Sequence, residues 1–140
     1  MGNVIKRFDL MGVVTKGVKP PNCDETLQIR VNDANDGIAR GIWQVDERFI
    51  NGLGVAMGGF VSSAADIMMA YAVASKLHNG QSFTSIDLHT TFHRPVLMGE
   101  VIVEARVERI GKRTAYVVAD LVQNEKKTAS VVSSVMIIGE

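Results

Sequence analysis

The chain has 140 residues, a length that suits one hydrophobic core, so we expect a single domain spanning residues 1–140. Lys+Arg and Asp+Glu number 15 each, and this zero net charge argues against binding to nucleic acid or to an anionic membrane, which needs a positively charged face. The single cysteine, Cys23, excludes an internal disulfide and Cys-based zinc sites and suits a reducing compartment. No apolar run is long enough to cross a membrane, and Met1–Lys6 lacks the apolar stretch of a signal peptide, so we expect a soluble, cytoplasmic protein.

The N-terminal third of the sequence predicts a short extension followed by a β-hairpin. We take residues 1–24 as the extension, with a short turn of helix in its first fifteen residues and a connector over residues 17–24. Apolar and polar residues alternate from Leu27, residues 32–37 are rich in turn formers, and residues 38–45 have the pattern of a second strand. These two strands are therefore expected to pair as a hairpin.

One long helix is predicted from Gly58 to about Leu77. Its apolar residues cover nearly every face, a pattern typical of a helix that is buried on all sides. Several alanines would let neighbouring elements approach closely, and residues 78–80 end the helix. We therefore expect this helix at the centre of the fold.

Four strands are predicted after the helix, over residues 83–93, 101–107, 114–122 and 128–138, and no second helix separates them. Strands that follow one another without crossover helices are expected to be antiparallel. The economical arrangement of one long apolar helix and one large sheet is a sheet that wraps around the helix. The sequence thus predicts an α+β fold.

A glycine-rich segment, residues 51–59, leads directly into the predicted helix. It is not a Walker loop, since no Gly-Lys-Ser/Thr follows, and its glycine spacing differs from a dinucleotide-binding fingerprint. Backbone N–H groups at a helix N-terminus, with the positive end of the helix dipole behind them, can hold an anion or a developing oxyanion. The alternative is a turn that only lets the chain enter a crowded core.

Asp66 lies eight residues after Gly58, within an apolar stretch of the predicted helix. Burying a carboxylate costs several kcal/mol unless it is paired or hydrogen-bonded. Ser62 and Ser63 lie one turn earlier and are placed to donate hydrogen bonds to it. This context favours a functional carboxylate over the alternative, in which Asp66 faces a hydrated seam and bonds only those hydroxyls.

The glycine-rich segment and Asp66 together resemble the signature of a known family. Acyl-CoA thioesterases of the hotdog fold, in the branch of the phenylacetate-degradation and 4-hydroxybenzoyl-CoA thioesterases, share Asn-x-x-Gly-x-x-His-Gly-Gly, with an Asp eight residues after the first of the paired glycines. The resemblance extends from about Gly37 to Ile138. It implies an antiparallel sheet wrapped around one long buried helix. The matching positions are Asn51, Gly54, Met57, Gly58, Gly59 and Asp66, together with the segments 92–95, 99–100 and 109–113.

The resemblance also implies an activity, the hydrolysis of an acyl-CoA thioester to a carboxylic acid and CoA. The N–H of Gly58 would polarise the thioester carbonyl, and Asp66 would act as general base on water or as nucleophile. Asn51 would help to place the carbonyl or the water. A hydroxyl in the strand after the helix, matching Ser85, or Thr84 if the register differs by one residue, would help to hold the water.

One position departs from the family signature, because Met57 stands where the family has a histidine. A thioether cannot donate a hydrogen bond, whereas the backbone N–H of Gly58 does not depend on this side chain. Met57 and Gly59 are therefore assigned to substrate contact rather than to the chemistry. The departure keeps open an alternative function, a non-catalytic acyl-CoA-binding protein. A hotdog dehydratase is disfavoured, since no His–Asp pair stands at the start of the helix to serve as its acid and base.

Three cationic residues are candidates for binding the phosphates of coenzyme A. Lys112 and Arg113 lie in a predicted hairpin turn and Arg94 follows the strand 83–93. Arginine and lysine both suit phosphate recognition, although residues in a turn are commonly just solvated. We expect neither a metal nor a redox cofactor to take part in the reaction.

The spacing of the two main catalytic candidates predicts a site shared between subunits. Eight residues along one helix correspond to about 12 Å, whereas an attacking water must lie within roughly 3–3.5 Å of the carbonyl carbon. Gly58 and Asp66 of one chain therefore cannot act on the same thioester. We expect a homodimer with composite sites, in which the strands 83–93 pair across the two-fold axis, and further assembly into a dimer of dimers.

Overall fold

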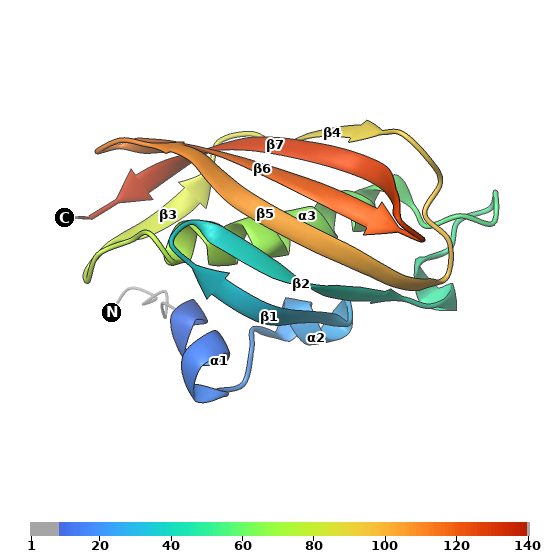
Figure 1. The fold of residues 1–140 in the computed structure, drawn as a ribbon, viewed down its shortest axis with the longest axis horizontal. Coiled ribbons are helices and arrows are strands. Elements are labelled where there is room, and N and C mark those ends of the chain that lie inside the picture. Colours follow the sequence, from blue (N-terminus) through green and yellow to red (C-terminus); the bar gives the residue numbers. More distant parts are fainter. Residues whose placement is uncertain (1–8, 140) are drawn as a thin grey trace, which may run out of the picture.

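The computed structural model describes residues 9–139, so the segment Met1–Lys6 lies outside the described part of the chain. An antiparallel sheet curves around one long helix, which confirms the expected hotdog fold (Figure 1). In chain order the elements are α1 (Leu10–Lys16), α2 (Asn22–Thr26), β1 (Ile29–Asn35), β2 (Ile38–Val45), a 3-10 turn (Glu47–Phe49), α3 (Gly58–Ala74), β3 (Ser82–Ser85), β4 (His89–Phe92), β5 (Gly99–Ile110), β6 (Thr114–Gln123) and β7 (Lys126–Ile138).

The sheet has the order β1-β2-β5-β6-β7, and both β3 and β4 pair with the free side of β7. Every pairing is antiparallel, as expected for strands that are not separated by helices. Within the described residues, β3 and β4 have no strand on their other side. They therefore form an edge of the sheet with free backbone hydrogen-bonding groups.

The first hairpin is longer than the sequence indicated. We expected a turn over residues 32–37, but β1 continues to Asn35 with an irregular register between Val31 and Asp33. The turn itself consists of Asp36 and Gly37, whose φ angles are 49° and 86°. Two successive positive φ values are typical of the two-residue turn that joins twisted antiparallel strands, and Asp-Gly favours it.

The expected strand 83–93 is interrupted, and its two halves do not follow one alternation. Between β3 and β4, the carboxylate of Asp87 accepts a hydrogen bond from the backbone N–H of Ser134 at 2.8 Å. Ser85 and Thr90 both pair with buried residues of β7, so both face α3, although a continuous strand would place them on opposite faces. The prediction of one continuous strand over residues 83–93 was therefore wrong.

The N-terminal extension packs onto the domain through α1 and α2. The connector predicted over residues 17–24 includes the start of α2, which places Asp24 in the core with only 2% of its surface exposed. The hydroxyl of Tyr71 on α3 donates a hydrogen bond to this carboxylate at 2.6 Å. Burial raises the pKa of Asp24, and the hydrogen bond from Tyr71 opposes the rise. The extension is thus tied to the central helix by a buried polar contact.

Substituting Tyr71→Phe is expected to lower the free energy of unfolding by about 1–3 kcal/mol, because a buried carboxylate loses its hydrogen-bond donor. Chemical denaturation would measure the loss. Since the folded pKa of Asp24 is raised, its ionised form is the costly one, and the cost of losing the donor should shrink as the pH falls and the carboxyl is protonated. Asp24→Asn is the matched control, because the amide oxygen still accepts from Tyr71 without a buried charge. An equal loss for Tyr71→Phe at neutral and acid pH would contradict this account.

The long helix α3 is buried on one side only, which corrects the expectation of burial on every side. The side under the sheet carries its fully buried residues, whereas Gly59, Ser63, Asp66 and Ala70 remain partly or largely exposed. Spacings of four, three and four residues place these positions on one strip of the helix, which we call the open strip. One curved sheet covers only one side of a helix, so apolar composition alone overstated the burial. Among the described residues no helix is long and apolar enough to cross a membrane.

Candidate active site

The N-terminus of α3 presents free backbone donors. Met57 is the cap residue, and its side chain makes no capping hydrogen bond. The N–H groups of Phe60 and Val61 bond the carbonyl of Met57, but those of Gly58 and Gly59 meet no acceptor among residues 9–139. Two unpaired donors at the positive end of a 17-residue helix form a site that favours negative charge.

Asn51 organises the loop that leads into this helix. Its Oδ1 accepts hydrogen bonds from the N–H of Leu53 at 2.9 Å and of Val55 at 3.4 Å, and its own N–H donates to the carbonyl of Val55. Gly54 completes the turn with a φ of 83°, a conformation that favours glycine. The side-chain amide nitrogen of Asn51 has no acceptor within the described residues, so it remains available as a donor. The sequence motif did not reveal that the oxygen of this side chain holds the loop.

A pocket of about 400 Å³ lies beside the free donors of α3. It brings together the predicted residues Asn51, Gly58 and Arg94. The remaining lining comes from the loop, from α3 and from the segment that follows β4: Val55, Ala56, Val61, Phe92, His93, Pro95 and Val96. Most of these side chains are apolar, so the pocket combines an apolar wall with a few polar groups, as ligand sites commonly do.

Asp66 lies on the open strip of α3, with its side chain exposed in the single chain. The expected donors do not reach it, because Ser62 Oγ pairs with Thr90 Oγ1 at 2.6 Å and Ser63 Oγ donates to the carbonyl of Gly59 at 2.8 Å. The expectation of a carboxylate buried by its own chain was therefore wrong. The Asp66 carboxylate has no hydrogen bond or ion pair within the described part of the chain. The protein that surrounds its base still removes enough water to raise its pKa above the ordinary range.

The hydroxyl candidates lie on β3, at the edge of the sheet. Ser85 pairs with Val135 and faces α3, whereas Thr84 pairs with Met136 on the opposite face. Of these two residues, Ser85 therefore has the orientation that the proposed role requires. Both side chains are exposed in the single chain.

The cationic candidates lie at the two ends of α3. Arg94 lines the pocket at the helix N-terminus, where its Nη1 donates to the carbonyl of Lys127 at 2.7 Å. Lys112 lies near the helix C-terminus in a concavity of about 560 Å³ that Lys76 and His78 also line, and Arg113 is exposed beside it. The length of α3 separates the two groups by roughly 24 Å within one chain.

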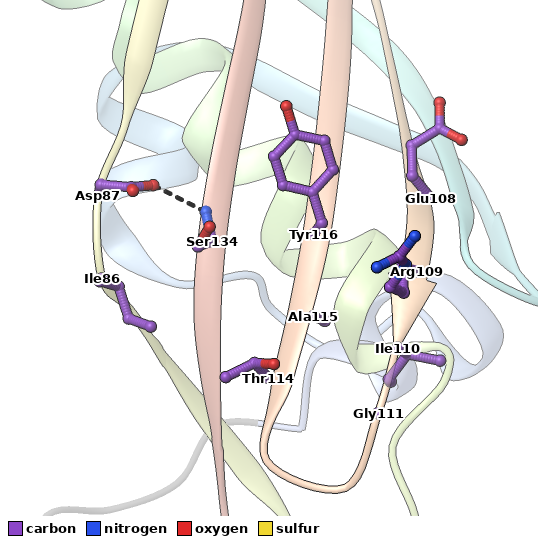
Figure 2. Close-up of a pocket in the computed structure, with 10 residues that line it drawn as sticks. All are labelled: Ile86, Asp87, Glu108, Arg109, Ile110, Gly111, Thr114, Ala115, Tyr116 and Ser134. Atoms are coloured by element: carbon purple, nitrogen blue, oxygen red, sulfur yellow. Dashed lines mark hydrogen bonds between the residues drawn. The ribbon is translucent and has the colours of Figure 1, made fainter.

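A larger concavity, of about 930 Å³, lies on the outer face of the sheet. Figure 2 shows its lining residues Arg109, Tyr116 and Ser134 on neighbouring strands. Tyr116 is exposed while both its neighbours in β6 are buried, so it points away from α3. None of the predicted catalytic residues lines this concavity, and its size alone therefore does not make it the candidate active site.

The family described as Thioesterase superfamily matches residues 53–130, which is more than half of the chain. The chain belongs to this superfamily. A protein of Pseudomonas aeruginosa named as an esterase is 32% identical over 88 residues, which cover 62% of the chain and 66% of that relative. The chain thus spans slightly less than two thirds of the length of this curated relative.

Solved structures of thioesterase-related proteins have the same fold. A phenylacetic acid degradation-related protein of Ralstonia eutropha, described as a thioesterase, has a TM-score of 0.85 and 25% identity, with 91% of the chain and 98% of that protein covered. The PaaI protein of the E. coli phenylacetic acid degradation operon has a TM-score of 0.78 and 26% identity, with 85% and 86% covered. These similarities confirm the resemblance that was drawn from the glycine-rich motif and Asp66.

Proposed function

We propose that the protein hydrolyses acyl-CoA thioesters at a site that combines residues of two subunits. The observation that carries this proposal is the uncapped N-terminus of α3, which opens into an apolar pocket beside Asn51. Free donors at that position suit the oxygen of a thioester carbonyl, on which negative charge develops during hydrolysis. Membership of the thioesterase superfamily supports the same reaction.

In the proposed mechanism the N–H of Gly58 polarises the thioester carbonyl and Asp66 of the partner subunit activates a water. The water oxygen attacks the carbonyl carbon while its proton passes to the Asp66 carboxylate. The resulting oxyanion is held by the N–H donors at the start of α3. The C–S bond then breaks, the carboxylic acid is released, and the CoA thiolate takes a proton from Asp66. Asn51 would place the carbonyl, and Ser85 would hold the water.

A two-fold dimer that covers the open strip would complete such a site. The strip carries the unpaired Asp66, and the neighbouring sheet edge of β3 and β4 has free hydrogen-bonding groups. Antiparallel pairing of α3 with its copy places Asp66 of one subunit opposite Gly58 of the other, with the axis near Ser62. The covered strip would also further desolvate Asp66, which strengthens it as a base.

The same arrangement would bring the separated cationic residues together. In antiparallel helices, the C-terminal end of one α3 extends toward the N-terminal loop of the other. The partner's Lys112 and the partner's Arg113 would then lie at the same end of the dimer as Arg94, where the phosphates of coenzyme A are expected. Met57 and Gly59 would contact the substrate beside Gly58.

The outer face of the sheet is the surface that we propose for joining two dimers. It exposes large apolar side chains that a monomeric surface rarely gathers. Among them, Tyr116 and Met136 are 42% and 47% exposed. Native mass spectrometry would distinguish a dimer from a dimer of dimers.

The proposed reaction is tested by mixing the protein with aryl, short-chain and long-chain acyl-CoAs in the presence of a thiol-trapping dye. A hydrolase releases free thiol with at least one of them. The alternative, a non-catalytic acyl-CoA-binding protein, is kept because Met57 replaces the family histidine. It would give a saturable shift of the melting temperature and no thiol.

Substituting Met57→His is expected to raise turnover, because an imidazole at the cap position adjacent to Gly58 can donate a hydrogen bond that the thioether cannot. The side chain of Met57 is 45% exposed, so the substitution should be tolerated by the fold. Steady-state kcat on the best substrate of the panel is the measurement. A correctly folded variant that gains activity on no substrate would favour the binding protein.

A further inference from the structure

We propose that Phe92 selects the acyl group, admitting groups that are flat or unbranched at the carbon next to the carbonyl and excluding those that are fully branched there. This inference rests on the proposed thioester hydrolysis and deepens it, because it assigns a substrate class to the pocket at the start of α3. The family resemblance covered the segment 92–95 but gave Phe92 no role.

The ring of Phe92 stands against the proposed oxyanion donors. A Cβ added to Gly58 would lie 2.9 Å from Phe92 Cζ and 3.4 Å from Cε1, so the ring fills the space beside the α-carbon of Gly58. Phe92 is 54% exposed and lines the same pocket as Gly58 and Asn51. A carbonyl oxygen held by the N–H of Gly58 therefore places the adjoining acyl carbon beside an aromatic wall.

The wall is held firmly by its strand. Thr90, two residues before Phe92 and on the same face of β4, is hydrogen-bonded through Oγ1 to Ser62 on α3 at 2.6 Å. Immediately after Phe92, the N–H groups of His93 and Arg94 both donate to the carbonyl of Thr128, at 2.8 and 3.1 Å. The strand is thus fixed to α3 before Phe92 and to β7 after it, so the backbone that carries the ring is held in place.

The shape of the wall decides which acyl groups fit. A flat aryl group or a straight chain can lie along an aromatic ring and gains from the apolar contact. A carbon that carries three substituents beyond the carbonyl has no flat side to present, so one of its methyl groups must meet the ring. We expect the extra methyl group of such a branched acyl group to lower kcat/KM by about tenfold or more relative to a straight chain.

The test compares the wild type with Phe92→Ala, using butyryl-, benzoyl- and pivaloyl-CoA and the release of thiol as the readout. We expect the ratio of kcat/KM for pivaloyl-CoA to that for butyryl-CoA to rise about tenfold or more in Phe92→Ala. Benzoyl-CoA should lose activity, because it loses the ring that it packs against. Phe92→Leu, which keeps an apolar side chain, should fall between the two proteins.

Substitutions at two further positions distinguish a specific effect of the Phe92 ring from a general loss of structure. Thr90→Val removes the bond that positions β4 and should shift the same ratio in the same direction but less, whereas Thr90→Ser should restore it. Ile102→Ala removes another exposed apolar side chain, on β5, and should leave the ratio unchanged.

The outcomes distinguish this inference from the proposed function. If the wild type hydrolyses acyl-CoAs and Phe92→Ala keeps its selectivity, the inference is overturned and the function stands. If no acyl-CoA is hydrolysed, the function fails, and the comparison is made with ketone analogues that carry a methylene between sulfur and carbonyl. Equal melting-temperature shifts for straight and branched analogues in the wild type and in Phe92→Ala would then overturn the inference as well.

Discussion

Asp66→Asn is expected to lower thioester hydrolysis by about 10²-fold to 10⁴-fold, because an amide of nearly the same shape cannot take the proton from the attacking water. Thiol release under saturating acyl-CoA measures the loss. Unchanged activity in a folded Asp66→Asn protein would rule out the proposed base. Asp33→Asn on the exposed part of β1 removes one negative charge elsewhere and should leave the rate unchanged.

The substitution Asp66→Asn should not lower the stability of the folded protein. Desolvation raises the pKa of Asp66 in the folded chain, so the carboxyl contributes most to stability below its unfolded pKa, and this contribution is lost as the pH rises through the folded pKa. At neutral pH the asparagine relieves that cost, and the melting temperature should stay equal or rise slightly. The activity of the wild type should fall on acidification, with a midpoint above the ordinary carboxyl range, because the base must be ionised.

Mixed dimers provide the second large effect. Asn51→Ala damages the site at the N-terminal end of α3, and Asp66→Ala removes the base, so each variant should be inactive as a homodimer. After unfolding and refolding together, half of the dimers are mixed, and each mixed dimer has one site with both lesions and one site with neither. Activity should therefore return to about a quarter of the wild-type value.

The control for this experiment is the dimer composition itself. Native mass spectrometry must detect the heterodimer, since the two variants differ in mass. A mixture that contains heterodimers and stays inactive would overturn the shared site. Asp66→Ala refolded alone gives the background activity, and wild type refolded alone gives the activity expected for full recovery.

Patterns within single elements could be predicted from the sequence. The alternation of apolar residues in β5, β6 and β7 and the apolar run of α3 were sufficient for an antiparallel sheet around one helix. The glycine-rich segment and Asn51 were placed correctly beside the start of α3, because their positions depend on local chain geometry. The expected hairpin also formed, with its turn at Asp36 and Gly37.

Features that depend on distant parts of the chain could not be predicted. The exposure of Asp66 depends on which side of α3 the sheet covers. The residues of the helix do not indicate that side, because apolar residues occur on nearly every face. The break between β3 and β4 depends on the bond between Asp87 and Ser134, which lie 47 positions apart. The place of Phe92 against Gly58 likewise required the path of β4 over the end of the helix.

The three residues that separate Ser85 from His89 change the face of the sheet to which the following side chains point. In a continuous strand from Ser85, Thr90 and Phe92 would point to the outer face of the sheet. Because of this linker they face α3 instead. Relative to β7 the linker holds one extra residue, because the four steps from Ser85 to His89 lie opposite the three steps from Val135 to Val132. Deleting one linker residue would give an uninterrupted alternation in which Thr90 and Phe92 still face α3. We therefore expect the pairing of β4 with β7, and with it the substrate pocket, to survive such a deletion.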